Sequence, residues 1–477
     1  MKRLLMLLAI ALVACNPIGP SQDKPAQDDS GKDEPAQDDN GGTSQGDPAQ
    51  DDNGGPSQGD PAQDDNGKDD NGKDDKEGEA YNDYVRVPLQ SVVDGVQPMT
   101  GIVLWTDSEF ASRKEITLEF SYVRYNDVCK EKDVYDWSTV DKILSGVAAH
   151  GHQAIIRFYY SYPGRNCTVP DYIKALPDYE ETKGKSEGRS TTFPDWRCEE
   201  LQRFHKEFYR LFAERYDNDP RLAFLETGFG LWAEYHIYDG PFYLGKTFPG
   251  KEFQAEFLAA MPGWFKKTPW LISIDAANGK YGPFKAYPEL KDVAFGNFDD
   301  SFMCEEHDDD NRSNWKYFGA DRYKTAPEGG EFSYYTSYDQ KHCLDRKGMY
   351  GRKFEDEVAK YHLSFIIGND QPEYQSWSRI VEASQSMGYH FCVSDFRVKP
   401  GTGAAVRIEN TGVAPLYYDA FLDVDGVRSE YNLRELLPGG PVWVEIQVPD
   451  VSEHPVLSIA CDRLVAGQKI GFEADVR

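Results

Sequence analysis

The chain has 477 residues, of which 39% are hydrophobic, 13% aromatic and 28% charged. This length exceeds what one small hydrophobic core uses and accommodates a large domain with a smaller appended one. The formal net charge of −29, from 52 Lys and Arg against 81 Asp and Glu, argues against a basic nucleic-acid-binding surface, and we expect no nucleic-acid partner.

The first residues have the pattern of a bacterial export signal. Lys2 and Arg3 precede an apolar run over 4–14, which is too short to span a bilayer. The run ends in Leu-Val-Ala-Cys at 12–15, which resembles a lipobox, the motif whose cysteine is acylated. We predict a signal peptide over 1–14 and a lipid on Cys15 that anchors the protein in the bacterial cell envelope, at the outer membrane or cell surface. The alternative is an ordinary cleaved signal followed by a chance cysteine.

Residues 15–80 have the composition of a disordered acidic linker. A 13-residue unit repeats with Pro35, Pro48 and Pro61 in register, and 16–80 contain 19 acidic and 5 basic residues and no aromatic one. Such a segment buries too little apolar surface to offset the entropy of ordering. A calcium-binding interpretation of 69–72 (Asp-Asp-Asn-Gly) is weaker, because the periodic spacing of a calcium repeat is absent.

From residue 81 onward, short apolar runs alternate with stretches of helical periodicity, which indicates an α/β fold. Apolar residues at helical spacing over 201–212 precede a stop at Asp219-Pro220, and further helices are expected over 354–361 and 374–387. These units predict a (β/α)8 TIM-type barrel over 81–391. Its eight expected strands are 101–106, 116–125, 153–160, 222–227, 270–276, 293–298, 323–331 and 363–368.

After residue 388 the apolar periodicity changes from helical to two. Val442, Val444, Ile446 and Val448 alternate with Trp443, Glu445 and Gln447, and glycine and proline punctuate the segment. We predict a small antiparallel β-sandwich over 392–477. Such a domain either binds glycan or packs on the barrel, and packing is the favoured role.

Cysteines and histidines add two expectations. With Cys15 lipidated, seven cysteines remain, so at least one thiol is unpaired; Cys167 and Cys198, which flank one loop, are the first pair to test. His150 and His152 lie two residues apart at a helix end, where a capping or surface role is favoured. No metal site is expected.

Two glutamates are the candidate catalytic residues, because barrel enzymes carry reactive groups after the C-terminal ends of their strands. Glu234 follows strand four between Trp232, Tyr235 and His236, and a carboxyl held against aromatic surface has the raised pKa that suits a general acid. Glu331 ends strand seven after two glycines, and a second carboxylate there can attack an anomeric carbon. The alternatives are a solvated loop glutamate at 234 and a simple turn at 331.

Other polar and aromatic residues are candidate substrate contacts. Arg157 is a charge in an otherwise apolar third strand, so it should point to the barrel mouth and a carboxylate. Asp300 follows strand six and Asp107 follows strand one. Flat rings with polar edges stack on sugars, although aromatic residues also fill cores. The predicted substrate-binding residues are therefore Arg157, Asp300, Trp232, Tyr235, His236, Asp107 and Tyr159.

At these positions the chain resembles an uncharacterised family of exported bacterial barrel proteins with a C-terminal β-sandwich. The matching segments are Arg157-Phe158, residues 230–236 (Gly-Leu-Trp-Ala-Glu-Tyr-His), 299–302 and 327–331 (Pro-Glu-Gly-Gly-Glu). Ala233 stands where the family pattern has glycine, and Asp299 where it has asparagine. The similarity covers roughly 97–477. That family is similar to glycoside hydrolases with the acid/base on strand four and the nucleophile on strand seven, which implies sugar chemistry as a class.

These patterns together predict an exported glycoside hydrolase that acts on a poly- or oligosaccharide as a monomer without a cofactor. Glu234 would be the general acid/base and Glu331 the nucleophile, with a retaining mechanism favoured. Arg157 and Asp300 would orient the substrate. The alternatives are a non-catalytic cell-surface glycan-binding lipoprotein on the same barrel, and a purely structural surface protein.

Overall fold

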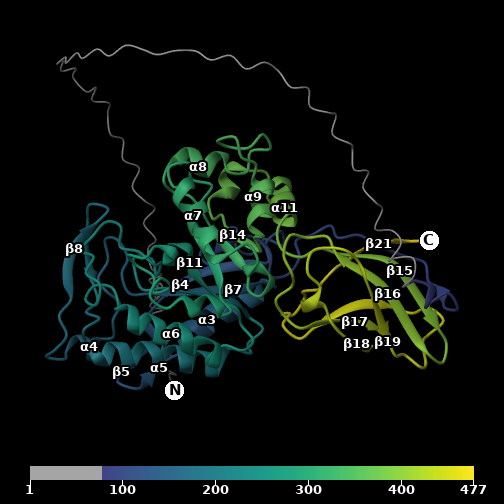
Figure 1. The fold of residues 1–477 in the computed structure, drawn as a ribbon, viewed down its shortest axis with the longest axis horizontal. Coiled ribbons are helices and arrows are strands. Elements are labelled where there is room, and N and C mark those ends of the chain that lie inside the picture. The colour runs from purple at the N-terminus through teal and green to yellow at the C-terminus, as the bar shows by residue number, and fades with distance from the viewer. Residues whose placement is uncertain (1–77) are drawn as a thin grey trace, which may run out of the picture. The chain divides into compact units, whose positions relative to one another are not determined.

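The computed structural model describes residues 78–477 (Figure 1). The predicted signal peptide, the predicted lipidation site Cys15 and the repeats of the predicted linker fall outside these residues. Among the described residues, no helix has both the length and the apolar character that crossing a membrane requires.

Eight parallel strands close into a barrel, which confirms the predicted (β/α)8 fold. The ladder runs in chain order and returns from the last strand to the first. In order, the barrel strands are β3 (Gly101–Trp105), β4 (Leu118–Arg124), β7 (Gln153–Tyr159), β10 (Leu222–Thr227), β11 (Trp270–Ser273), β12 (Gly296–Phe302), β13 (Glu328–Phe332) and β14 (Phe365–Ile367).

Two of the expected strands are shifted toward their C-terminal ends. Strand six begins at Gly296 rather than at 293, and a Cβ at Gly296 would lie 1.8 Å from the Pro327 carbonyl oxygen. The close approach of β12 and β13 therefore starts at this glycine. Residues 322–324, expected in strand seven, form a short 3-10 helix, η3 (Arg322–Lys324), and β13 starts after Pro327.

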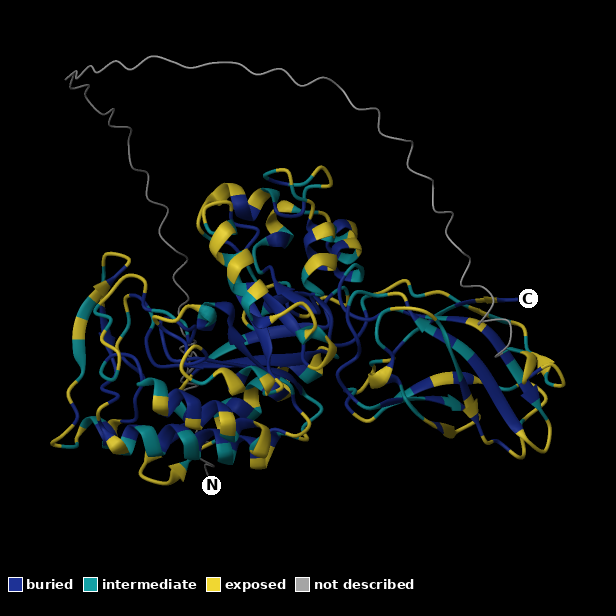
Figure 2. Ribbon diagram, viewed as in Figure 1, coloured by how far each residue is buried: buried dark blue, intermediate teal, exposed yellow. Residues whose placement is uncertain are grey.

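Helices cover the outside of the barrel, and the strands between them are the most buried part of the molecule (Figure 2). α5 shows the packing: its Phe208 ring lies 4.7 Å from the ring of Phe158 on β7, edge to face. The helices are α2 (Tyr125–Val128), α3 (Ser138–Ala149), α4 (Asp171–Lys174), α5 (Glu199–Tyr216), α6 (Lys251–Trp264), α7 (Asp308–Phe318), α8 (Ser337–His342), α9 (Phe354–Tyr361), α10 (Gln371–Tyr374) and α11 (Trp377–Gln385), with 3-10 turns η1 (Ile274–Ala277), η2 (Pro288–Asp292) and η4 (Leu433–Glu435). Two hairpins, β5 (Cys129–Glu131) with β6 (Val134–Tyr135) and β8 (Thr182–Ser186) with β9 (Arg189–Phe193), extend the loops.

Two sheets that share one hydrophobic core follow the barrel. The larger has the order β19-β16-β15-β21-β2, with β1 also paired to β15, and the smaller has the order β18-β17-β20. Their strands are β1 (Val85–Arg86), β2 (Leu89–Ser91), β15 (Phe391–Lys399), β16 (Gly403–Asn410), β17 (Ala420–Val424), β18 (Val427–Asn432), β19 (Val442–Ile446), β20 (Leu457–Cys461) and β21 (Glu473–Val476).

The larger sheet differs from the expectation in two ways. β21 runs parallel to β15, so this sheet is mixed rather than purely antiparallel. β1 and β2, from the range assigned to the barrel, pair instead with β15 and β21. The reason is that the chain passes beside the edge of this sheet before it enters β3, and unpaired strand edges favour added strands.

The C-terminal sheets pack against the N-terminal ends of the barrel strands, in agreement with the favoured packing role. Tyr418 donates its hydroxyl to the Ala223 carbonyl oxygen, and Arg463 Nη2 donates to the Leu222 carbonyl oxygen at 2.9 Å. Gln153 Nε2 donates in return to the Arg463 carbonyl oxygen at 2.8 Å. The opposite end of the barrel, where the strands finish, is left to the loops.

The seven cysteines after Cys15 are all free thiols, five of them buried. The pairing proposed for Cys167 and Cys198 is therefore wrong. Both side chains are part of the apolar core between the barrel and α5, so burial explains them without a covalent bond.

Candidate active site

A layer of charged side chains fills the C-terminal end of the barrel above a layer of aromatic ones. Inward-pointing residues alternate along each strand, and the Arg157 guanidinium lies 4.1 Å from the centre of the Phe298 ring beneath it. The charged layer consists of Tyr122, Arg157, Glu226, Asp300 and Glu331, one from each of β4, β7, β10, β12 and β13.

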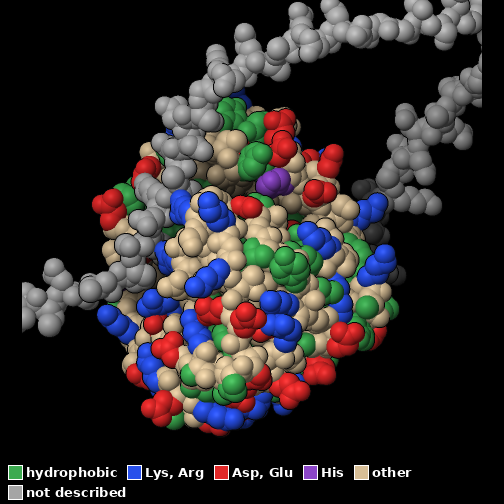
Figure 3. All heavy atoms as spheres, turned by 90° about the vertical axis from the view of Figure 1, so that its left-hand side faces the viewer, with side chains coloured by type: hydrophobic (Ala, Val, Ile, Leu, Met, Phe, Trp, Pro, Cys, Tyr) green, Lys and Arg blue, Asp and Glu red, His purple; other side chains and the backbone are tan. Residues whose placement is uncertain are grey.

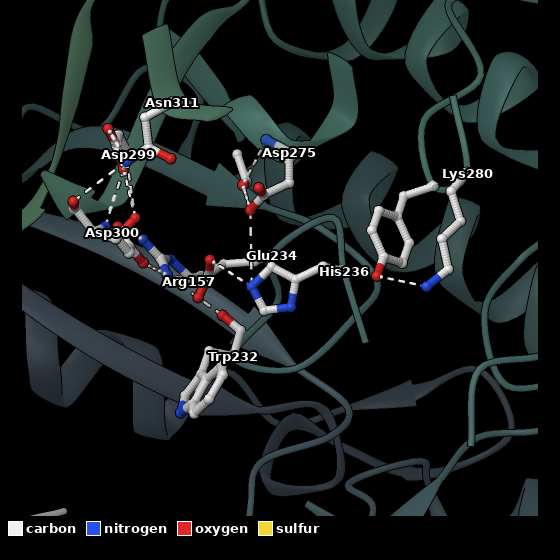
Figure 4. A network of polar contacts seen from close by, with 12 residues as sticks. Arg157, Trp232, Glu234, His236, Asp275, Lys280, Asp299, Asp300 and Asn311 are labelled. Carbon is white, nitrogen blue, oxygen red and sulfur yellow. Dashed lines mark hydrogen bonds and ion pairs between the residues drawn. The ribbon is translucent and has the colours of Figure 1, made fainter. Parts of the chain in front are cut away.

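Arg157 is the centre of this layer and is fully buried. Its Nε donates to Glu226 Oε2 at 2.8 Å, and its Nη1 lies 2.5 Å from Asp300 Oδ2 (Figure 4). Nη1 also lies 3.2 Å from the Tyr122 hydroxyl. The predicted contact of Arg157 with a carboxylate at the barrel mouth is thus present, with two carboxylates rather than one. Burial raises the pKa of Glu226 to about 7, with Arg157 opposing the shift and Asp300 adding to it.

The loop after β10 has an unusual backbone that positions Glu234. Trp232 and Ala233 have φ of 53° and 60°, in the left-handed region that favours glycine. Gly228 and Gly230 permit the fold of this loop, because a Cβ on either would lie 2.0 Å or less from a backbone carbonyl oxygen. The glycine of the family pattern at 233 is therefore explained by conformation, and Ala233 adopts that conformation at some cost in energy.

Glu234 follows this loop and lies beside the His236 imidazole, which in turn lies near the Asp275 carboxylate. Its Oε2 lies 3.0 Å from Nε2 of His236, which lies 3.7 Å from Asp275 Oδ2 after β11 (Figure 4). Glu234 is 9% exposed, and burial raises its pKa while His236 opposes the shift. For His236, burial lowers the pKa, but Glu234, Asp275 and Asp300 outweigh it and raise the value to about 9. The Glu234–His236 pair therefore retains a proton at neutral pH.

Glu331 stands on β13 after two glycines that the packing requires. A Cβ at Gly329 would lie 2.3 Å from the Phe365 ring, and one at Gly330 would lie 2.1 Å from the Asp299 carbonyl oxygen. Burial raises the pKa of Glu331 well above its usual range, Asp300 and Glu234 raise it further, and Arg157 opposes them. Its Oε1 is buried without a hydrogen-bond partner among the described residues.

The arrangement suits acid/base chemistry between two carboxyl groups. The charge of Glu234 contributes to the raised pKa of Glu331, so the two carboxyl groups belong to one electrostatic cluster. Five carboxylates and two cations converge there, and such an excess of buried negative charge holds protons at neutral pH. Glycoside cleavage requires one carboxyl group that can donate a proton and a second whose oxygen is free to attack the anomeric carbon.

The other predicted substrate contacts fall in different places. Trp232 is at the cluster: its carbonyl oxygen accepts from Arg157 Nη1 at 3.4 Å, and its ring stacks on Tyr238. The prediction that Tyr235 contacts the substrate is corrected, because this side chain is fully buried and packs on Phe229 behind the loop, away from any substrate. Asp107 is exposed, and within residues 78–477 it forms no hydrogen bond or ion pair with the cluster.

Tyr159 lies next to the charged layer but also lines a separate cavity of about 480 Å³. Its ring centre is 5.7 Å from that of Tyr122, and its hydroxyl accepts from Arg165 at 3.4 Å. None of the clustered carboxylates lines this cavity, so it adjoins the candidate site rather than containing it. On the molecular face drawn in Figure 3, acidic and basic side chains are interspersed, and neither sign dominates.

Asp299, the second departure from the family pattern, points away from Asp300 into the surrounding helices. Both of its oxygens accept from Asn311 Nδ2 at 3.0 Å, and Oδ2 accepts from Trp315 Nε1 at 3.3 Å (Figure 4). Burial raises its pKa to about 7. The residue at 299 therefore fixes α7 against β12, and the departure does not remove a group from the cluster.

Three residues of the cluster were missed from the sequence: Glu226, Asp275 and Tyr122. Glu226 had a signal, since it is a charge inside an otherwise apolar strand and pairs in register with Arg157 on the neighbouring strand. Asp275 lay inside the predicted fifth strand, 270–276, whereas the structure ends β11 at Ser273 and places Asp275 in the 3-10 turn that follows. Glu234, His236 and Asp275 bring three potential metal ligands within 4.8 Å of one another. The contact with Glu234 uses Nε2 of His236, and Nδ1 of this histidine is buried without a hydrogen-bond partner among the described residues.

No family model matches the chain, and no curated protein matches it. Among solved structures, it is similar to endo-glycoceramidase II from Rhodococcus sp. in complex with ganglioside GM3 (TM-score 0.39, 10% identity, covering 78% of this chain and 99% of that one). It is also similar to a glycoside hydrolase family 30 subfamily 8 xylanase from Clostridium acetobutylicum (0.34, 9%, 80% and 96%). A third is a GH5-4 broad specificity endoglucanase from an uncultured bacterium (0.35, 12%, 61% and 86%).

These neighbours are glycoside hydrolases. The expected (β/α)8 barrel is confirmed by the closed eight-stranded sheet of this chain itself.

Proposed function

We propose that the protein is a glycoside hydrolase that cleaves a poly- or oligosaccharide with retention of anomeric configuration. Glu234 is the general acid/base and Glu331 the nucleophile. The observation that carries the proposal is a pair of electrostatically linked glutamates at the C-terminal end of the barrel: Glu234 is buried beside an imidazole, and Glu331 is partly buried with one unpartnered oxygen.

In the first step, Glu234 protonates the glycosidic oxygen as Glu331 attacks the anomeric carbon, and the leaving sugar departs. The proton comes from the Glu234–His236 pair. In the second step, Glu234 takes a proton from a water molecule while the water oxygen attacks the anomeric carbon. This attack breaks the bond between that carbon and Glu331 and releases the Glu331 carboxylate. Arg157 holds Asp300 in place by their ion pair, and Asp300, which is partly exposed, orients the sugar at the barrel mouth.

The sequence of residues 2–15 supports a proposal for where in the cell this activity takes place. We propose that the protein is exported and held in the cell envelope by a lipid on Cys15, with the acidic repeats as a spacer. The substrate is then polysaccharide outside the cytoplasm.

Hydrolysis of a panel of aryl glycosides and polysaccharides tests the proposal. Glu234→Gln should lower kcat by about 10²–10⁴-fold while leaving substrate binding intact. Glu331→Gln should abolish turnover, and Glu252→Gln, at an exposed position on α6, should leave it unchanged. Wild-type protein that binds glycan but turns over none of the panel would instead support the non-catalytic glycan-binding alternative.

Azide distinguishes the two roles. With Glu234→Ala, azide should replace water in the second step and give a glycosyl azide of the substrate's own anomeric configuration. With Glu331→Ala, azide should attack directly and give the opposite configuration. The reverse pattern would exchange the two assignments, and a first product of inverted configuration from wild type would overturn the retaining mechanism.

A further inference from the structure

A second cluster of ionisable side chains lies near the opposite end of the barrel from the candidate active site. Glu119 is the second residue of β4 and is 1% exposed. Its neighbours Leu118 and Phe120 belong to the core inside the barrel, so Glu119 points outward, toward the C-terminal end of α3. His150 and His152 meet it there.

The end of α3 turns both imidazoles to the same side. His150 is the C-cap of the helix, and Gly151 follows with φ of +80°. This left-handed glycine reverses the chain, and the His152 backbone N–H returns to the Val147 carbonyl oxygen at 3.2 Å. Nδ1 of His150 and Nδ1 of His152 each lie 2.8 Å from Glu119 Oε1.

The buried carboxylate is incompletely satisfied by these contacts. Glu119 Oε2 has no hydrogen-bond partner within the part of the chain that the structure describes, and no lysine or arginine there forms an ion pair with Glu119. Transfer of a carboxylate from water into a protein interior is costly unless its charge and its lone pairs are matched. A divalent cation supplies the missing positive charge.

We propose that Glu119, His150 and His152 bind a divalent transition-metal ion, and that these donor atoms favour Zn²⁺. Two imidazole nitrogens and one carboxylate oxygen are a common zinc ligand set. The ligand atoms lie within 4.8 Å of one another. Bonds of about 2.0–2.1 Å at tetrahedral angles place ligand atoms about 3.3 Å apart, so each 2.8 Å contact opens by about half an ångström.

Water completes the coordination on the side of His150, whose side chain is 33% exposed, whereas that of His152 is 3% exposed. The ion ties the end of α3 to β4 and does not take part in the reaction, because the catalytic carboxyls stand at the other ends of the strands. The site also adjoins the junction with the C-terminal sheets, where Gln153 donates to the Arg463 carbonyl oxygen. The metal therefore stabilises the base of the barrel.

Metal titration of the chelator-treated full-length protein tests this site. One Zn²⁺ should bind per chain and raise Tm, and Co²⁺ should give the intense visible bands of a four-coordinate site without thiolate charge-transfer bands. His150→Asn, at a partly exposed position, should keep the metal-free Tm close to wild type and weaken Zn²⁺ binding by more than about 100-fold. His152→Asn should do the same to binding. His454→Asn, on an exposed loop of the C-terminal domain, is the matched control and should change neither.

Three results would overturn the proposal. The first is no stoichiometric binding of Zn²⁺ or Co²⁺. The second is binding that survives both histidine substitutions but is lost in His236→Asn, which would move the metal to the cluster of Glu234 and Asp275. The third is thiolate charge-transfer bands, which would assign it to cysteine.

Discussion

Replacing Arg157 with methionine is the sharpest test of the charged layer, because the side chain is fully buried between two carboxylates. Methionine keeps the length and apolar packing over Phe298 and removes the charge. Glu226, itself unexposed, and Asp300, with 7% of its side chain exposed, then lose the cation they share. Removing one partner of a buried ion pair destabilises a protein by about 3–5 kcal/mol. This is a large share of the 5–15 kcal/mol that is typical of a whole domain.

Denaturant unfolding followed by fluorescence and circular dichroism measures the loss. Arg210→Met is the matched control, since Arg210 forms partly exposed pairs with Glu207 and Glu214 on the surface of α5, and it should cost about 0.5 kcal/mol or less. Adding Glu226→Gln to Arg157→Met removes one of the stranded charges. The double variant should therefore recover at least about 1 kcal/mol relative to the single one.

The pH dependence gives an independent readout whose sign follows from linkage. Without Arg157, which opposes the shift, the pKa of Glu226 in the folded protein rises further above its unfolded value, so the folded state holds a proton that the unfolded state releases. Stability conferred by this proton is present at low pH and lost as pH rises. The gap to wild type should widen by about 1.4 kcal/mol per pH unit for each extra proton held. A loss below about 1 kcal/mol, or an equal gap at pH 6 and pH 8, would refute the claim that these charges are desolvated.

Three further outcomes follow from the same structure. The pH profile of kcat/KM should be bell-shaped. Its acid limb should lie above the pKa range of an ordinary glutamate, because Glu331 must ionise, and its alkaline limb should lie near pH 9, where the pair containing His236 loses its proton. A flat profile from pH 5 to 9 would contradict both pKa directions. Gly228→Ala should destabilise the protein by about 1–3 kcal/mol in thermal unfolding, because the new Cβ would lie 2.0 Å from a carbonyl oxygen. The control Gly146→Ala, in α3 with open space around it, should stabilise the protein by about 0.5–1 kcal/mol. Equal effects of the two substitutions would rule out the close approach at Gly228. Cys15→Ser should abolish incorporation of labelled fatty acid and release the protein from the detergent phase, and retention there would show that the cysteine is not the anchor.

Much of the barrel was predictable because most of its strands are short apolar runs with helical periodicity on either side. Strands buried on both faces have this pattern whatever their partners, so these runs were found without knowing the register. The polar and glycine-rich β12 and β13 lack this pattern, and their predicted starts were too early in the chain. Arg157 was predictable for a related reason: a charge inside such a run requires a partner. The identity of the partners was not predictable, because Asp300 lies 143 positions along the chain and meets Arg157 only when the barrel closes.

The loop after β10 shows where sequence reasoning stops. Trp232, Glu234, Tyr235 and His236 are nearly consecutive and looked alike as cleft residues, yet Tyr235 turns into the core. Two left-handed residues in the loop remove any periodicity from which the direction of a side chain can be read. Backbone conformation therefore separates the residues that meet the cleft from the one that fills the core.

The sequence by itself determined the strand–helix alternation, the period-two segment at the C-terminal end and the two glutamates at the ends of strands four and seven, because these depend on local composition and spacing. Only the tertiary structure decided that Glu226 and Asp275 join those glutamates, that β1 and β2 complete the C-terminal sheet, and that Glu119 meets the two histidines. These contacts join residues on separate elements. Such pairs are brought together by closure of the barrel and by strand register, which local periodicity does not encode.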